Sequence, residues 1–96
     1  MPRQDVLDIL TQFRAAKQNE FGIVRIGIFG STARDSATDR SDVDVVVELL
    51  RPDLFSLIGI KQELEELLDR PVDIVRSRPR MNSFLKQRIE EEVVYV

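Results

Sequence analysis

The sequence predicts an α/β (α+β) fold in which a small mixed β-sheet of three strands is flanked by helices. Two observations carry this prediction: helical and strand-like segments alternate along the chain, and the strand-like segments are short runs of β-branched residues. A chain of 96 residues removes from water roughly two-thirds of the surface that its unfolded form exposes, enough for one modest core. We therefore expect residues 1–96 to form a single domain.

The first helix and strand are predicted by a change of periodicity. Residues 5–19 place Val6, Leu10 and Phe13 at spacings of four and three, which is the pattern of an amphipathic packing helix. Residues 23–29 then form an apolar run rich in branched residues, typical of a short buried strand. The glycine inside this run indicates either a close backbone approach or merely a small neighbour.

The second strand carries two acidic residues on one face. Residues 30–41 are small and polar, long enough for one helical turn and a loop, and residues 42–49 return to a strand pattern with a period of two. One face receives Val43, Val45 and Val47, and the other receives Asp42, Asp44, Val46 and Glu48. The two aspartates therefore point the same way.

The second half predicts two helices and a third strand. Asp53 is suited to be the N-cap of a helix that Pro71 terminates. Its apolar stripe, which we expect in the core together with Phe13, consists of Leu57, Ile60, Leu64, Leu67 and Leu68. Residues 72–75 form the third strand and residues 81–92 the last helix. The apolar end, residues 93–96, either completes the core or forms a partner-binding edge.

Polar residues from separate segments are expected to meet at one end of the sheet. A right-handed crossover makes the second and third strands parallel, which brings Asp42, Asp44 and Asp73 together. If the first strand runs antiparallel to the second, the turn at Gly30 and Ser31 reaches the same end. Taken singly, the turn fits an ordinary strand-to-helix connection and the aspartates fit solvated edges, but their combination favours a functional site.

The expected cluster suits a metal and a phosphate. Three neighbouring carboxylates repel one another unless a cation neutralises them. Mg2+ takes one or two carboxylates together with substrate phosphates, and two such ions about 3.5–4 Å apart can serve one transfer reaction. Gly30 permits close backbone approach to a phosphate, and Ser31 offers a hydroxyl beside a helix start. The turn is not a Walker A loop, and the aspartates do not form an EF-hand.

The composition excludes other classes of site and partner. The chain has no cysteine and no histidine, which rules out zinc sites built on thiolate or imidazole, cysteine or serine–histidine nucleophiles, and disulfides. The formal net charge of -3 makes long nucleic acid an unfavourable partner. Apolar runs fall short of the roughly 18 residues of a membrane span, and the first residues do not resemble a signal peptide. We expect a cytoplasmic protein without a membrane segment.

At this point the sequence resembles the minimal nucleotidyltransferase branch of the DNA polymerase beta-type nucleotidyltransferase superfamily. The resemblance covers nearly the whole chain, and ten residues separate Ser31 from Asp42, as is usual in that family. The matching segments are residues 29–34 (Phe-Gly-Ser-Thr-Ala-Arg), 41–47 (Ser-Asp-Val-Asp-Val-Val-Val) and 72–75 (Val-Asp-Ile-Val). One departure is Asp35, where many relatives have glycine.

The resemblance implies roles for the clustered residues. Gly30 and Ser31 would hold a nucleoside triphosphate, Asp42 and Asp44 would coordinate Mg2+, and Asp73 would complete the metal site and help to activate the acceptor hydroxyl. The implied reaction is transfer of AMP from ATP with release of pyrophosphate. Arg34 would bind phosphate, or else only pair with Asp35 or Asp39.

The resemblance also implies a partner. The minimal branch includes antitoxins paired with small all-helical HEPN toxins, whose tyrosine hydroxyls accept AMP. The alternatives are a non-catalytic module that neutralises a partner by contact and an enzyme that adenylylates a small molecule such as an antibiotic. Assembly into an oligomer is left open. A basic cluster is expected to contact phosphates or an acidic partner, or simply to be solvated: Arg76, Arg78, Arg80, Lys86 and Arg88.

Overall fold

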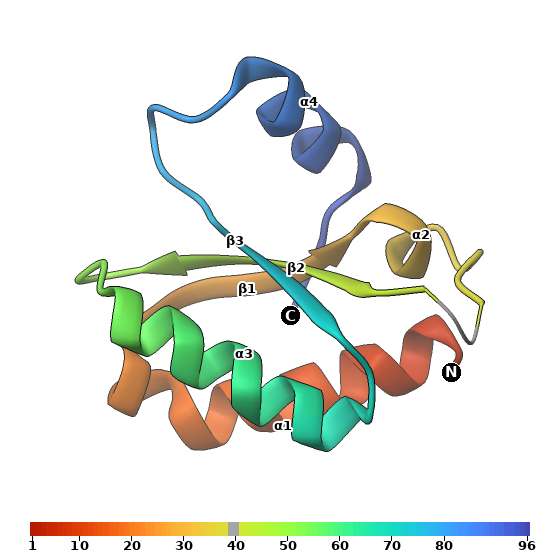
Figure 1. The fold of residues 1–96 in the computed structure, drawn as a ribbon, viewed down its shortest axis with the longest axis horizontal. Coiled ribbons are helices and arrows are strands. Elements are labelled where there is room, and N and C mark those ends of the chain that lie inside the picture. Colours follow the sequence, from red (N-terminus) through yellow and green to blue (C-terminus); the bar gives the residue numbers. More distant parts are fainter. Residues whose placement is uncertain (39–40) are drawn as a thin grey trace.

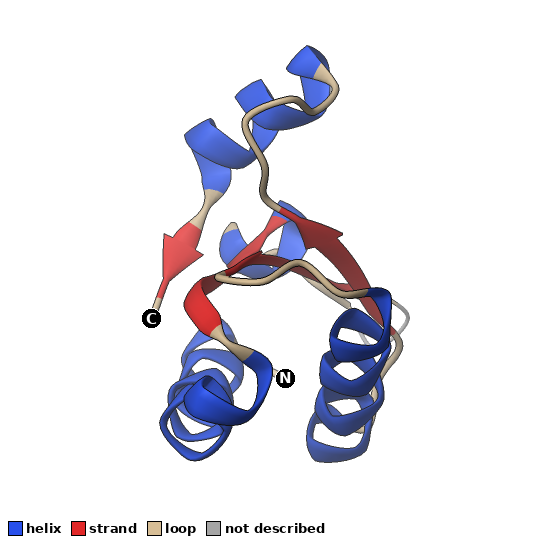
Figure 2. Ribbon diagram, turned by 90° about the vertical axis from the view of Figure 1, so that its left-hand side faces the viewer, coloured by secondary structure: helices blue, strands red, loops and turns tan. Residues whose placement is uncertain are grey.

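The computed structural model describes residues 1–38 and 41–96. Its elements are α1 (Arg3–Phe21), β1 (Ile23–Phe29), α2 (Gly30–Ala33), β2 (Val43–Leu49), α3 (Leu54–Leu68), β3 (Val72–Arg76), α4 (Ser83–Glu92) and β4 (Val94–Tyr95). The strands form a sheet in the order β3-β2-β1-β4. Figure 1 shows α1 and α3 side by side under one face of this sheet, and Figure 2 shows α4 on the opposite side. The α+β prediction is confirmed.

The sheet is mixed in the predicted way. β1 and β2 are antiparallel, whereas β2 and β3 are parallel and joined through α3. In this register Phe29 pairs with Asp44, and Asp44 pairs in turn with Asp73. The end of β1 and the beginnings of β2 and β3 therefore meet at one end of the sheet, as the crossover argument requires.

A fourth strand was not predicted. β4 pairs antiparallel with β1, with Gly27 opposite Tyr95 and Ile28 opposite Val94. A Cβ atom on Gly27 would lie 2.6 Å from the Val94 carbonyl oxygen, so this glycine marks a close backbone approach and not merely a small neighbour. The apolar end of the chain extends the sheet, and a two-residue strand is too short for periodicity to reveal.

Two apolar clusters lie on opposite faces of the sheet. Val43, Val45 and Val47 are buried in the main core with the inner faces of α1 and α3. On the other face, Val46 packs with Phe29 and Ile89, and Ile89 belongs to α4. The period-two prediction for β2 is confirmed, and Asp44 shares the α4 side with Val46.

The helix boundaries follow local backbone chemistry. The Asp53 side chain accepts a hydrogen bond from the Phe55 backbone N–H at 3.0 Å, so the predicted N-cap is confirmed. The expectation that Pro71 ends α3 is wrong by two positions, because Asp69 leaves the helix in a left-handed conformation (φ 52°). No helix in the described part of the chain is both long and apolar enough to span a membrane.

The apolar stripe of α3 is narrower than predicted. Ile60, Leu64 and Leu68 are buried against the sheet, but Leu67 is 54% exposed, so its placement in the core is wrong. Residues four apart share one helical face, whereas Leu67 is rotated by about 100° from Leu68 toward the groove beside α1. The neighbouring helix covers too little of this side to bury it.

This difference predicts unequal effects of two leucine truncations. Leu64→Ala removes a fully buried side chain, so we expect it to lower the free energy of unfolding by about 2–5 kcal/mol. Leu67→Ala makes the same chemical change at an exposed position of the same helix, and we expect a change within about 0.5 kcal/mol. Chemical denaturation of both variants measures the difference. Equal losses would contradict the described packing of α3.

Candidate active site

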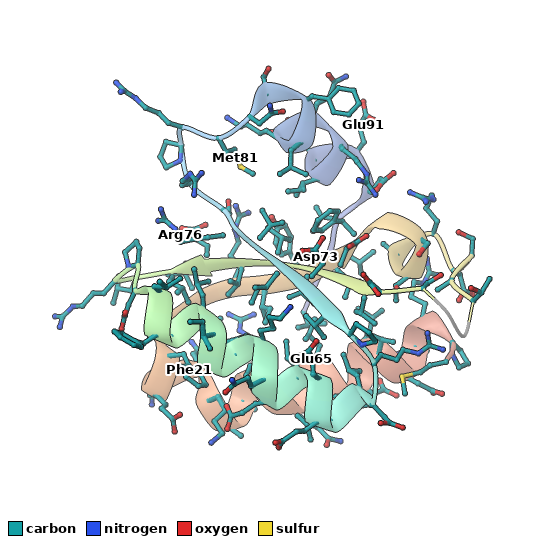
Figure 3. The ribbon with its side chains drawn as sticks, viewed as in Figure 1. Phe21, Glu65, Asp73, Arg76, Met81 and Glu91 are labelled. Carbon is teal, nitrogen blue, oxygen red and sulfur yellow. The ribbon has the colours of Figure 1, made fainter. Side chains whose placement is uncertain are left out.

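The carboxylates that the sequence singled out lie around the start of β2. Asp44 pairs in register with Asp73 of the parallel strand β3, and Asp42 lies one residue before β2. The Asp44 side chain is only 21% exposed, whereas Asp42 and Asp73 are exposed. The structure therefore brings Asp44 and Asp73 to adjacent positions of the sheet, with Asp42 two residues from Asp44. Asp73 lies near the start of β3 (Figure 3).

The electrostatics of Asp44 reflect this crowding. Burial raises the pKa of the Asp44 carboxyl above its ordinary value, and the nearby negative charge of Asp73 raises it further. The Arg88 guanidinium opposes the rise, while Asp42 and Glu92 add smaller contributions to it. Burial, which is the largest cause, and the neighbouring Asp73 carboxylate therefore outweigh the effect of the Arg88 cation on the pKa of Asp44.

The donor set fits a divalent cation of the magnesium type. Carboxylate oxygens are the hard ligands that Mg2+ prefers, and a cation would relieve the repulsion between the Asp44 and Asp73 carboxylates. Within residues 1–38 and 41–96, no three acidic side chains are gathered closely enough to enclose an ion by themselves. Mg2+ usually keeps several waters and shares its coordination with substrate phosphates, so the carboxylates would supply only part of its ligands.

The Gly30 turn lies directly against Asp44. Gly30 is buried at the start of α2 with φ +72°, and a Cβ atom built on it would lie 2.2 Å from Asp44 Oδ2 and 3.3 Å from Arg88 Nη2. Only glycine allows the backbone to approach the carboxylate this closely. Ser31 follows at a half-buried position, and its carbonyl oxygen accepts the Ser36 backbone N–H at 2.9 Å.

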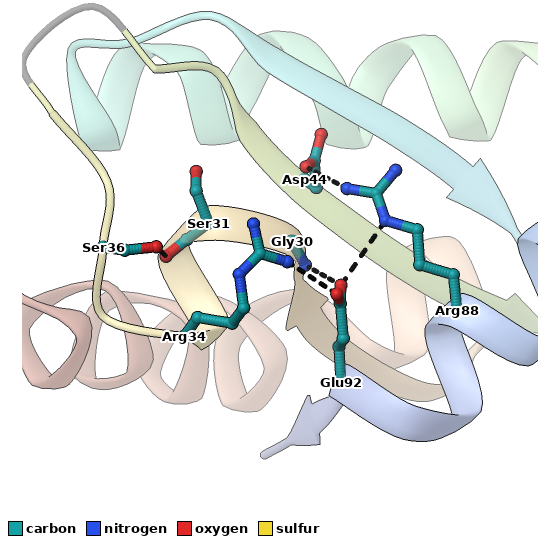
Figure 4. Close-up of polar contacts among 7 residues, drawn as sticks. All are labelled: Gly30, Ser31, Arg34, Ser36, Asp44, Arg88 and Glu92. Atoms are coloured by element: carbon teal, nitrogen blue, oxygen red, sulfur yellow. Dashed lines mark hydrogen bonds and ion pairs between the residues drawn. The ribbon is translucent and has the colours of Figure 1, made fainter.

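A glutamate that the sequence did not single out occupies the Gly30 turn. Glu92 is the last residue of α4, and its Oε2 accepts the Gly30 backbone N–H at 3.0 Å (Figure 4). Its Oε1 lies 2.6 Å from Arg34 Nη1. The ion-pair partner of Arg34 is thus Glu92 and not Asp35, while Asp39 lies outside the described residues.

Glu92 is held in its charged form. Burial by itself would raise the pKa of Glu92, but the Gly30 N–H and the Arg34 and Arg88 guanidinium groups together lower it below its ordinary value. Glu90, Glu91 and Glu92 follow one another in the sequence, so composition does not distinguish the last of them. The spacing of four residues from Arg88 was the available signal, because such a pair lies on one helical face.

The predicted basic cluster separates into two groups. Arg88 belongs to the site: its Nε lies 3.5 Å from Glu92 Oε2, its Nη2 lies 3.9 Å from Asp44 Oδ2, and its guanidinium stands 5.6 Å from the centre of the Phe29 ring. Arg76 lies at the opposite end of β3 from Asp73 (Figure 3) and lines a separate cleft of about 400 Å³ with Arg78 and Lys86. The Arg78 Nε donates to the Arg80 carbonyl oxygen.

Asp35 adopts the backbone conformation that glycine favours. Its φ is 58°, in the left-handed region, where aspartate is tolerated better than most residues. The Arg3 backbone N–H donates to Asp35 Oδ1 at 3.0 Å, which ties the loop to the start of α1. Asp35 therefore replaces the glycine of many relatives while keeping the left-handed backbone conformation that glycine favours.

The contact between Gly30 and Asp44 predicts different effects of two glycine substitutions. Gly22→Ala and Gly30→Ala both place a side chain at positive φ, which costs about 1–2 kcal/mol. At Gly22 the nearest atom to the new Cβ would be Leu50 Cβ at 3.7 Å, an ordinary contact, whereas at Gly30 it would be Asp44 Oδ2. We expect Gly30→Ala to lower the free energy of unfolding by about 1–3 kcal/mol more than Gly22→Ala does, as measured by denaturant unfolding. Equal losses would show that Asp44 moves aside freely.

Comparisons with known proteins agree with this geometry. The model of the family described as Nucleotidyltransferase domain matches residues 9–96. The protein adenylyltransferase MntA of Thermococcus cleftensis is 35% identical over 94 residues, covering 97% of this chain and 94% of the relative. A solved structure provisionally described as a minimal nucleotidyltransferase superimposes with a TM-score of 0.79 at 29% identity, covering 98% of this chain and 95% of that one. The structure of a toxin–antitoxin with AMP-PNP has a TM-score of 0.75 at 21% identity, covering 92% and 69%.

These matches extend over both the Gly30 turn and the aspartates, and they agree with the resemblance seen in the sequence. The site combines a glycine turn, a half-buried carboxylate and a second carboxylate on the adjacent parallel strand. The chain belongs to the nucleotidyltransferase domain family, and it is an enzyme of this type.

Proposed function

We propose that the protein transfers AMP from magnesium-bound ATP to a hydroxyl group of a HEPN-type toxin and acts as its antitoxin in the cytoplasm. The observation that carries the proposal is the contact of the Gly30 turn with Asp44, because it sets oxyanion-binding groups beside paired carboxylates. A relative named protein adenylyltransferase and a structural neighbour described as a toxin–antitoxin with AMP-PNP support the choice of nucleotide and of a protein acceptor.

The triphosphate would be held by the turn and by Arg34. The Gly30 N–H and the Arg34 guanidinium both engage a carboxylate in this structure, and the same donors suit phosphate oxygens. Ser31 would add its hydroxyl. These groups would bind the triphosphate of ATP beside the carboxylates.

Asp42, Asp44 and Asp73 would each supply a carboxylate oxygen to Mg2+, whose remaining ligands would be water and the phosphates of ATP. Bound Mg2+ would neutralise phosphate charge, stabilise the departing pyrophosphate and lower the pKa of the acceptor hydroxyl. During transfer the hydroxyl oxygen bonds to the α phosphorus, the bond to pyrophosphate breaks, and the hydroxyl proton leaves toward Asp73. We assign Asp73 to the acceptor side because it enters from a separate strand and is exposed, whereas Asp44 is more enclosed by the turn.

The direct test is transfer to the partner. The protein is incubated with ATP, Mg2+ and a purified HEPN-type toxin, and intact mass and peptide mapping locate any gain of one AMP. A modified HEPN hydroxyl is the expected result. Neutralisation of the toxin without any mass gain would support the contact-only module, and modification of an antibiotic in its place would support a small-molecule transferase.

Asp44→Asn should abolish transfer but leave the fold intact. We expect a rate loss on the order of a hundredfold or more, because a ligand charge is removed. Since the folded-state pKa of Asp44 is raised, its ionised form costs stability above that pKa, so the variant should be as stable as the parent or more stable at neutral pH. This advantage should vanish at low pH, where the carboxyl is protonated in both states.

Asp8→Asn is the matched control for this variant, because Asp8 is exposed on α1 and accepts only a hydrogen bond from Gln4. It makes the same change of charge on the opposite side of the sheet, and we expect normal transfer. Thermal unfolding and single-turnover transfer are measured on both proteins. Near-normal turnover of Asp44→Asn would remove Asp44 from the metal site.

Asp73→Asn should separate binding from chemistry. If Asp73 serves the acceptor, the variant should bind magnesium-bound ATP within a few-fold of the parent and still lose most of its rate, because the acceptor hydroxyl stays near its solution pKa. Calorimetric titration and single-turnover transfer on the same preparation distinguish the two effects. A collapse of binding together with rate would place Asp73 on the nucleotide side. No change in either would make it an ordinary strand-edge acid.

A further inference from the structure

An internal ion pair occupies the proposed nucleotide site. Both carboxylate oxygens of Glu92 are engaged, Oε2 by the Gly30 N–H at 3.0 Å and Oε1 by Arg34 at 2.6 Å. Arg88 lies one helical turn earlier on α4 and stands between Glu92, at 3.5 Å, and Asp44, at 3.9 Å. Figure 4 shows the resulting chain of contacts from Arg34 through Glu92 and Arg88 to Asp44.

The charges along this row of contacts alternate as they would with magnesium-bound ATP in the site. Glu92 places an oxyanion on the groups to which we assign phosphate binding, and Arg88 places a cation beside the carboxylate to which we assign metal binding. A carboxylate and a phosphate are both recognised by guanidinium and backbone N–H groups through charge-assisted hydrogen bonds. Glu92 and Arg88 therefore resemble a phosphate and its counter-ion, although both belong to the protein.

Glu92 and a phosphate cannot both use these donors fully. The Gly30 backbone has a single N–H and donates it to Glu92, and Arg34 forms its ion pair at close range with the other oxygen of the same carboxylate. Any phosphate that takes these donors must first displace Glu92. Because a binding-competent conformation is then only part of the population, the apparent affinity for nucleotide is reduced by that fraction.

We propose that Glu92, paired with Arg88, is a built-in occupant of the phosphate-binding part of the nucleotide site, and that the phosphates of the nucleotide take its place when the nucleotide binds. The inference rests on the proposed function, since it assigns the same site to the triphosphate. Its consequence is that Glu92 sets nucleotide affinity from α4, and that the hydrogen bond from the Val93 N–H to the Ile89 carbonyl, at the end of α4, loosens when nucleotide enters. The Glu92 side chain is 20% exposed and ends the helix, so it can leave without unpacking Ile89.

The central experiment compares nucleotide affinity in two charge-neutralised variants of α4. Glu92→Gln keeps the size of the side chain but removes its charge, and we expect the dissociation constant for magnesium-bound ATP to fall about three- to tenfold. Glu90→Gln makes the same change of net charge on the same helix at an exposed position, and it should bind as the parent does. Calorimetric titration without any acceptor protein measures binding alone.

Two further measurements keep the test independent of folding defects. Glu92→Ala, which removes every contact of the side chain, should tighten binding in the same direction, and thermal unfolding reports how far each variant loses stability. In the unchanged protein, addition of magnesium-bound ATP should speed hydrogen exchange of the Val93 amide, which bonds to the Ile89 carbonyl at the end of α4.

The possible failures are distinguishable. If the parent binds ATP but both Glu92 variants bind equally or more weakly than Glu90→Gln, Glu92 is not a competitor, and the proposed function stands without it. Slower hydrogen exchange of the Val93 amide on ATP binding would also overturn the proposal, because the nucleotide would then stabilise the end of α4 and not loosen it. If neither the parent nor any variant binds ATP, the proposed function itself fails and the inference fails with it.

Discussion

The close approach of the Gly30 backbone to the Asp44 carboxylate is the constraint on which the site depends. The antiparallel register of β1 and β2 sets Phe29 opposite Asp44, and the left-handed turn at Gly30 then carries the chain over the carboxylate. A parallel neighbour adds Asp73 at the next position across the sheet. The Gly30 turn and the two carboxylates are thus brought together by backbone pairing.

This arrangement concentrates charge on a sheet that is otherwise apolar. Asp44 is flanked along β2 by Val43 and Val45, which are buried in the main core, while Val46 is buried on the α4 side. The strand is therefore packed on both faces, and the Asp44 carboxylate is only partly exposed to water. The raised pKa of Asp44 records the cost, and Arg88 offsets part of it from α4. A site with residual negative charge is suited to a substrate that arrives with its own metal ion.

Much of the framework could be predicted from the sequence because it follows local rules. The period of two along β2 assigned its faces, the right-handed crossover placed Asp44 beside Asp73, and Asp53 was evident as a helix cap. Glu92 could not be found in this way. It lies 62 positions from Gly30, and its role depends on how α4 folds back over the sheet. Leu67 was misplaced for the same kind of reason, since burial depends on the neighbouring helix.

Helix α4 is connected to the Gly30 turn through its contacts with β1. Ile89 fastens α4 to Phe29, the last residue of β1, and the chain beyond Glu92 continues directly into β4, which pairs with Gly27 and Ile28 of that strand. Glu92 thus sits between two attachments to β1, and the end of β1 leads into the donor that Glu92 occupies. Because both attachments hold the helix in place, the proposed displacement of Glu92 would require movement of its side chain and of the helix end beyond Ile89. The sheet would then keep Asp44 and Asp73 in register while the occupant of the site changes.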